Sequence, residues 1–260
     1  MQLLGIDIGG TTTKSAMVDT ASGGLVTPIH KIVTPRGFQP TEIIQIIRES
    51  ATHFDYDGPI GVGFPAIVVG GQVITPPTAY ASKGWEQNPI AASIEQSMRH
   101  PVTVINDADA AGIGEMQFGA GKNEGGVVMM ITIGTGIGSA LFFDGTLIPN
   151  LELGHIYLPG SNVIAENQAS ERVRHQEELD WPEWSRRLTS YFTLIERVFS
   201  PRVIIIGGEV SNEHDKFLPL IPTRAKLIPA QLRNQAGIIG AALAAAERRP
   251  LSDMLEHGRR

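Results

Sequence analysis

Short apolar runs that end in glycine recur along the chain and predict buried β-strands. Residues 3–8 form one such run and residues 127–133 form another. Each is followed, after a glycine-rich turn, by a second apolar segment at residues 14–18 or 139–143, which predicts a returning strand. Two units with the same strand–turn–strand plan indicate that the chain contains two duplicated halves.

Helices are predicted where apolar residues recur at a spacing of three or four. One starts at Thr41, and another covers residues 89–98. A third follows Asp180, which can cap it, with Glu183 three residues later as the capping-box partner. The last is an alanine-rich helix at residues 236–249. Further buried strands are predicted between the helices at residues 60–63, 102–105 and 203–206.

The alternation of strands and helices predicts an α/β fold. Because the strand–turn–strand unit occurs twice, we expect two α/β domains that face each other, with a boundary near residue 110. The smaller domain would cover residues 1–110 and be joined by the helix at 236–249, and the larger domain would cover residues 111–235. A chain of 260 residues is long enough to form two cores around a cleft.

Composition and charge exclude several classes of protein. Hydrophobic residues make up 42% of the chain and charged residues 18%, which is typical of a globular protein. The net charge of −6 gives no indication of a nucleic-acid partner. The absence of cysteine excludes disulfides, thiolate zinc sites and cysteine nucleophiles, and it fits the reducing cytoplasm. No apolar run approaches about 20 residues and no basic segment precedes the first strand, so we expect neither a membrane span nor a signal peptide.

Two glycine-rich hairpin tips and one strand end are candidates for phosphate binding. Glycines at such a tip let backbone N–H groups approach phosphate oxygens, and threonine hydroxyls add donors. Asp7 could also hold Mg²⁺, directly or through water. The alternative in each case is a plain turn, because short glycine patterns are common. The candidates are Asp7, Gly9, Gly10, Thr11, Thr12 and Lys14 at the first tip, Gly134, Thr135 and Gly136 at the second, and Gly207 and Gly208 after the strand at 203–206.

Polar side chains that could act on a hydroxyl compound follow two predicted strands. A kinase that transfers phosphate to a hydroxyl needs a carboxylate to accept the proton, which Asp107 could provide while Asn106 holds a neighbouring hydroxyl. The alternative for this pair is an Asx turn or helix cap. Glu152 and His155 together could grip neighbouring sugar hydroxyls. The alternative for His155 is a structural histidine or half of a metal pair.

Taken in order, these motifs resemble the ROK family of sugar kinases. The resemblance implies the actin-like ATPase (ribonuclease H-like) fold, with two α/β domains and an inter-domain cleft. Two departures are visible. A cysteine-rich zinc motif that the family often carries is missing, so no zinc site is expected, and Ala66 stands where the family usually has glycine. The similarity rests on Asp7-x-Gly9-Gly10-Thr11-x-x-Lys14 and on residues 63–65, 106–108, 134–138, 152–155 and 207–208.

The resemblance also implies a role for each candidate residue. Asp107 would be the general base for the 6-hydroxyl of the sugar, and the two glycine hairpins with Mg²⁺ would hold the phosphates of the donor. The residues implied to contact the sugar are Pro65, Asn106, Asp107, Glu152, His155 and Glu166.

The second half resembles one subgroup, the polyphosphate glucokinases, in residues 152–156, 169–174, 181–184, 199–201, 216–219 and 232–238. This implies glucose as acceptor, polyphosphate and possibly ATP as donor, and a cytoplasmic homodimer without a nucleic-acid or membrane partner. Residues 172–233 carry ten lysines and arginines against eight acids, although the whole chain is at −6. Binding of a polyanion needs such cations. The alternative for most of these lysines and arginines is a solvated surface on which they pair with nearby acids.

Two alternatives stay open. An ATP-dependent glucokinase or glucomannokinase is one, because Gly207-Gly208 keeps the turn that would face an adenosine. A sugar-sensing protein of the same family without catalytic activity is the other. Such sensors carry a helix-turn-helix domain ahead of the kinase-like part, for which the strand starting at Leu3 leaves no room, and the presence of Asp107 favours an enzyme.

Overall fold

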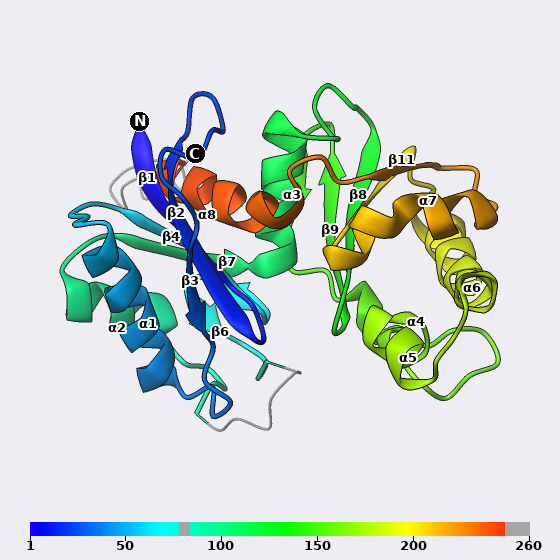
Figure 1. Ribbon diagram of the computed structural model, residues 1–260, viewed down its shortest axis with the longest axis horizontal. Coiled ribbons are helices and arrows are strands. Elements are labelled where there is room, and N and C mark those ends of the chain that lie inside the picture. The colour runs from blue at the N-terminus through cyan, green and yellow to red at the C-terminus, as the bar shows by residue number, and fades with distance from the viewer. Residues whose placement is uncertain (78–83, 248–260) are drawn as a thin grey trace, which may run out of the picture.

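The computed structural model describes residues 1–77 and 84–247, and within them two five-stranded sheets have the same strand order. In Figure 1 the two sheets lie side by side along the long axis of the molecule. The first has the order β3-β2-β1-β4-β7, with β1 (Gln2–Ile8), β2 (Thr12–Asp19), β3 (His30–Val33), β4 (Ile60–Phe64) and β7 (Val102–Asn106). The second has the order β10-β9-β8-β11-β12, with β8 (Val127–Ile133), β9 (Ile137–Phe143), β10 (Thr146–Ile148), β11 (Val203–Gly207) and β12 (Lys226–Pro229).

In each sheet the first three strands in sequence are antiparallel and the last two join in parallel. This shared order agrees with the internal duplication expected from the two glycine-ended runs. The carboxyl ends of parallel strands meet at one edge of a sheet, where ligands of α/β proteins commonly bind. The β1–β2 turn and Asp107 therefore lie at the same edge of the first sheet.

Helices cover both faces of the first sheet (Figure 1). On one face, α1 (Pro40–His53) and α2 (Ile90–Met98) bury Ile43 and Ile94 in a core with Leu4 of β1. On the other face, α8 (Ala236–Ala246) buries Ile238 against Leu3. Side chains of a strand alternate between faces, so neighbouring residues of β1 enter two different cores. A small two-stranded sheet of β5 (Val68–Val69) and β6 (Gln72–Val73) follows β4.

Helix α8 lies in backbone contact with the first half of the chain although it comes last in the sequence. A Cβ added to Gly61 of β4 would clash with the carbonyl of Ala241, and one added to Gly240 would clash with the carbonyl of Ala110 in α3 (Asp107–Phe118). Glycine permits such close approach because it has no side chain. The helix ends at Ala246 with Glu247 as its C-cap, and residues 248–260 lie outside the described residues.

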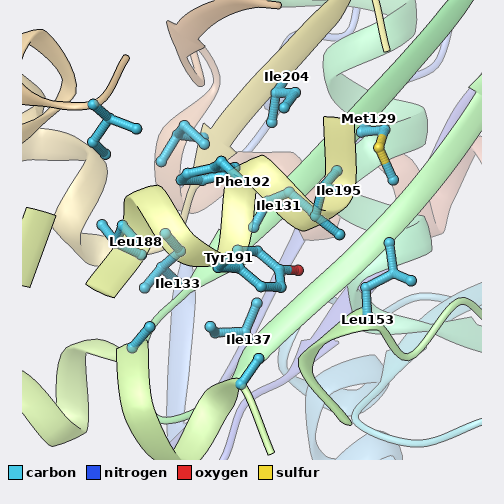
Figure 2. Close-up of a cluster of buried hydrophobic side chains, with 14 of the residues drawn as sticks. Met129, Ile131, Ile133, Ile137, Leu153, Leu188, Tyr191, Phe192, Ile195 and Ile204 are labelled. Carbon is cyan, nitrogen blue, oxygen red and sulfur yellow. The ribbon is translucent and has the colours of Figure 1, made fainter. Parts of the chain in front are cut away.

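The long helix α6 (Trp181–Phe199) covers the second sheet as its apolar spacing predicts. Tyr191, Phe192 and Ile195 pack on Ile131 and Ile204 of the sheet (Figure 2). The predicted N-cap is confirmed, because the carboxylate of Asp180 accepts a hydrogen bond from the backbone N–H of Glu183 at 2.7 Å, but the return bond from the Glu183 side chain that completes a capping box is not formed. Shorter helices complete this half: η1 (Leu153–His155), α4 (Glu166–Ala169), α5 (Glu171–Gln176), η2 (Glu209–Glu213), α7 (His214–Phe217), η3 (Leu218–Leu220) and η4 (Arg233–Gln235). Among the residues that the structure describes, every helix is too short or too polar to cross a lipid bilayer.

Glu115 is a buried carboxylate that ties α3 to the segment leading into α8. Its side chain accepts three backbone hydrogen bonds, from Ala120 at 2.7 Å, Gln231 at 3.1 Å and Leu232 at 2.7 Å. Glu115→Ala leaves three partly buried backbone donors without this partner, so we expect a loss of about 3 kcal/mol in the free energy of unfolding.

This prediction is tested by denaturant unfolding of Glu115→Ala beside Glu49→Ala, which removes an exposed glutamate from α1. The control should unfold within about 0.5 kcal/mol of the wild type. Equal stability of the two variants would contradict the structural role given to Glu115.

Candidate active site

A cleft of about 680 Å³ is lined by segments from both halves of the chain. It includes the β1–β2 and β8–β9 turns, the start of α3 and the start of α8. Most of the candidates from the sequence converge here: Asp7, Gly9, Gly10, Lys14, Pro65, Asn106, Asp107, Gly134, Thr135, Gly136, Glu152, His155, Glu166 and Gly208.

Three candidates do not line this cleft. Thr11 is exposed at the tip of the first hairpin, and its carbonyl accepts a hydrogen bond from Thr34. Thr12 is already part of β2 and pairs with Val33 of β3. Gly207 is still part of β11 and is buried against Met130, so the next residue, Gly208, reaches the cleft in its place. These three residues therefore do not line the cleft, and their part in phosphate binding stays a prediction.

Two carboxylates, Asp7 and Asp107, lie on either side of Gly63. In the parallel register Asp7 of β1 pairs with Gly63 of β4, which pairs with Ile105 of β7. A Cβ added to Gly63 would lie 3.8 Å from the Asp7 carboxylate and 3.6 Å from Cα of Asp107. Asp7 also touches the start of α8, where a Cβ on Gly237 would come within 2.8 Å of its Cγ. The sheet register thus brings both acids to one wall of the cleft.

Burial and neighbouring acids raise the pKa of Asp107 to about 8. The charges of Asp7 and Glu152 act in the same direction as burial, and the hydrogen bond from the N–H of Ala108 opposes them. Burial also raises the pKa of Asp7, against the attraction of Lys14. A carboxylate with a pKa near the working pH is suited to accept a proton from a hydroxyl, because it is basic and still ionised in part.

The side chain of Asn106 is used mainly to cap α3. Its Oδ1 accepts hydrogen bonds from the N–H groups of Ala108 at 2.8 Å and Asp109 at 3.0 Å. Its Nδ2 donates to the carbonyl of Ala66 at 3.2 Å. The helix cap that sequence reasoning kept as an alternative is therefore present. By capping α3, Asn106 fixes Asp107 at the first position of the helix, facing the cleft.

Glu152, His155 and Glu166 form a second polar wall. Nε2 of His155 lies 3.6 Å from Oε1 of Glu166, and Oε2 of Glu166 accepts a long hydrogen bond of 3.4 Å from the N–H of Ile137 at the second hairpin. Burial raises the pKa of Glu152, with His155 opposing this shift. Acceptors and a histidine that surround a polar cleft could bind several hydroxyls at once.

Sequence reasoning missed a clasp that joins the two halves beside this wall. The side chain of Asn150, two residues before Glu152, exchanges two hydrogen bonds of 2.9 Å with the backbone of Val68 in β5. The backbone N–H of Asn150 also donates to buried Asp109 at 2.8 Å. Burial raises the pKa of Asp109 to about 7, and its other oxygen has no hydrogen-bond partner. Neither Asn150 nor Val68 belongs to a sequence motif that could have indicated this contact.

Comparison with known proteins gives a consistent result. The model of the ROK family matches residues 3–175. The polyphosphate glucokinase of Mycobacterium tuberculosis (strain CDC 1551 / Oshkosh) is 39% identical over 241 residues, which cover 92% of this chain and 89% of that protein.

Solved structures agree with the sequence comparison. The crystal structure of the inorganic polyphosphate/ATP-glucomannokinase from Arthrobacter sp. strain KM has a TM-score of 0.89 at 40% identity, covering 94% of this chain and 98% of that one. A ROK family glucokinase from Streptomyces griseus, in complex with glucose and AMPPNP, has a TM-score of 0.81 at 25% identity, covering 95% and 100%. The predicted actin-like ATPase fold is confirmed. The fold, the converging motifs and the family match together show that this chain belongs to the ROK family.

Proposed function

We propose that the chain is a polyphosphate-dependent glucokinase, which transfers a phosphoryl group from inorganic polyphosphate to the 6-hydroxyl of glucose. The similarity to the mycobacterial polyphosphate glucokinase extends over 92% of the chain and supports this donor and acceptor. The observation that carries the proposal is the position of Asp107. Its carboxylate faces a cleft that both glycine hairpins and the Glu152–His155–Glu166 wall also line.

The proposed reaction is a direct transfer in line. The 6-oxygen of glucose attacks the terminal phosphorus, the bond from that phosphorus to the bridging oxygen breaks, and Asp107 takes the hydroxyl proton. Backbone N–H groups at Gly10 and Gly136 would face the charge on the transferring group. Approach of the two halves would exclude water, which would otherwise compete with glucose as acceptor.

Magnesium fits this site as an ion shared with the donor. Among the described residues, no group of three or more histidines and acids surrounds a position where a metal could sit. Mg²⁺ is commonly held by one or two carboxylates together with phosphate oxygens. Asp7, beside Asp107 and Lys14, offers one such carboxylate. Bound there with the donor, the ion would neutralise charge on its phosphates.

The domain division and the assembly state are further parts of this proposal. We assign residues 1–110 with α8 to one domain and residues 111–235 to the other, and the contact of α8 with Gly61 supports placing it with the first. Family resemblance supports a cytoplasmic homodimer. Light scattering tests the dimer, because a monomer would have the mass of the chain, 28.0 kDa.

A side-by-side donor assay tests the proposed function. Glucose 6-phosphate formation is measured with Mg²⁺ and either long-chain polyphosphate or ATP, and we expect polyphosphate to support turnover at least as well as ATP. A strong preference for ATP would favour the ATP-dependent glucokinase or glucomannokinase. Binding of glucose without phosphorylation by any donor would favour the sugar-sensing alternative.

A further inference from the structure

A second cleft, of about 660 Å³, adjoins the active-site cleft beside the second hairpin. The two share Gly134, Thr135, Arg172 and Glu209 as lining residues, so they are continuous. The rest of the second cleft is lined by residues of α5, η2 and α7 and by the first residue of α6. A long ligand that leaves the active site past Thr135 would therefore enter this cleft directly.

Two arginines face the second cleft without a salt bridge to a carboxylate in the described part of the chain. Arg172 donates only to neutral oxygens, the Thr135 carbonyl at 3.0 Å and the side chains of Asn167 at 2.8 Å and Gln176 at 3.1 Å. The guanidinium of Arg174 lies 4.1 Å from the ring centre of Trp181, and its buried Nε has no hydrogen-bond partner. The guanidinium of Arg172 is thus held by uncharged partners, whereas Nη2 of Arg174 also lies 3.3 Å from Nε2 of His175 and its charge attracts Glu171. Within the residues that the structure describes, neither group is fixed in a salt bridge, so both can bind an anion.

The acids of this cleft are partly neutralised. Glu213 pairs with Lys216, whose Nζ lies 5.6 Å from the ring centre of Trp181. Glu171 lies 3.8 Å from His175, and burial raises its pKa. The cleft has three acids, Glu171, Glu209 and Glu213, against Arg172, Arg174 and Lys216. Among the described residues, Arg172, Arg174 and Glu209 form no salt bridge, while Arg174 attracts Glu171 at longer range. The positions of the cationic side chains, rather than the net charge of the cleft, make it suitable for an anion.

The packing of Trp181 indicates that the cleft suits the phosphates of a donor better than a nucleotide base. A nucleotide base would favour a free aromatic surface, but the Trp181 ring is already packed by the Arg174 guanidinium and by Phe217, whose ring is nearly parallel at a centroid distance of 5.9 Å. Planar guanidinium groups bind phosphate oxygens well.

We propose that the second cleft binds the polyphosphate chain beyond the reacting phosphate, with Arg172 at the junction of the two clefts and Arg174 and Lys216 farther along. This inference rests on the proposed function, because it assumes polyphosphate as donor. It assigns a binding role that the transfer step itself does not need. A short donor would leave the second cleft empty and would not contact Arg174 or Lys216.

The experiment compares donors of different length on the Arg174→Gln/Lys216→Gln double variant. We expect the KM for long-chain polyphosphate to rise about tenfold and to depend less on salt, because two contacts with phosphates are lost. The KM values for tripolyphosphate and ATP should stay within about twofold. The control is Arg186→Gln/Arg197→Gln, which removes the same charge from exposed positions on α6 and should leave all three KM values unchanged.

Each outcome decides between interpretations. Parallel increases for all three donors would show that the variant disturbs the active site and would overturn the extended binding site, as would an unchanged KM for the long chain. If the wild type does not use polyphosphate at all, the proposed function fails. Equilibrium binding of fluorescently labelled polyphosphate then tests the cleft separately, and equal affinity of wild type and double variant would overturn it. Arg174→Lys keeps the charge but not the planar group, and partial recovery of the KM would confirm that charge contributes.

Discussion

Replacing Asp107 by asparagine is expected to lower the turnover of glucose by at least about a hundredfold and to leave glucose affinity within about twofold. Asparagine has nearly the same shape as aspartate, so the cap on α3 and the shape of the cleft should persist. It cannot accept the proton of the attacking hydroxyl, so the loss should appear in kcat rather than in binding.

The measurement combines steady-state kinetics with calorimetric titration of glucose. Asp57→Asn, at a position with a highly exposed side chain on the first half, is the matched control and should keep wild-type turnover. Turnover of Asp107→Asn within tenfold of the wild type would remove Asp107 from its role as base. A parallel loss of glucose binding would point to a positioning role.

The sequence predicts the central strands well because their signals are local. The runs that became β1 and β8 are largely apolar, with Asp7 and Thr132 as their polar side chains, and both are followed by glycine. Both faces of these strands are covered in the structure. The edge strand β3 gave no such signal, because its four residues are all partly or fully exposed. The contacts of α8 with β1 and β4 join residues more than a hundred positions apart, which a local pattern does not report.

The types of residue that form the site could be predicted from the sequence, but their positions relative to the cleft could be predicted only in part. Asp107, Glu152 and His155 reach the cleft, because each follows a strand or turn at its edge. The sequence does not distinguish Gly207 from Gly208. In the structure Gly207 is the last residue of β11, whereas Gly208 lies beyond the strand and lines the cleft.

No sequence pattern indicated the hydrogen bonds between residues that lie far apart in the chain. The clasp between Asn150 and Val68 depends on one side chain whose amide meets a backbone 82 residues away. Arg172 and Arg174 were visible as charges, but their uncharged partners could not be read from the sequence.

The catalytic efficiency for glucose should increase steeply with pH up to about 8. With a pKa of about 8, about 1% of Asp107 would be ionised at pH 6 and about half at pH 8. The ratio kcat/KM at low substrate reports the free enzyme, so it should rise about fiftyfold over this interval and level off above it. A flat profile between pH 6 and 8 would show that Asp107 is already ionised at pH 6.

The pH dependence of protein stability, measured without Mg²⁺, gives an independent check on this pKa. Stability should fall as pH rises, whereas catalytic efficiency should increase. The pKa of Asp107 is raised on folding, so its contribution to stability is fully present below the unfolded value near 4 and is lost as pH rises toward 8. Asp107→Asn has no such group, so above pH 8 it should melt at a temperature about 5 °C higher than the wild type, with a smaller difference at pH 5.

Asp7→Asn separates the causes of this shift. The charge of Asp7 is the second contribution to the raised pKa of Asp107, after burial. Its removal takes away the pH dependence due to the raised pKa of Asp7 itself, and it should also move the part due to Asp107 to lower pH, while burial and Glu152 keep part of the shift. If the melting temperature of Asp7→Asn depends on pH in the same way as that of the wild type, the two carboxylates do not interact. This result would contradict their placement beside Gly63 on one wall of the cleft.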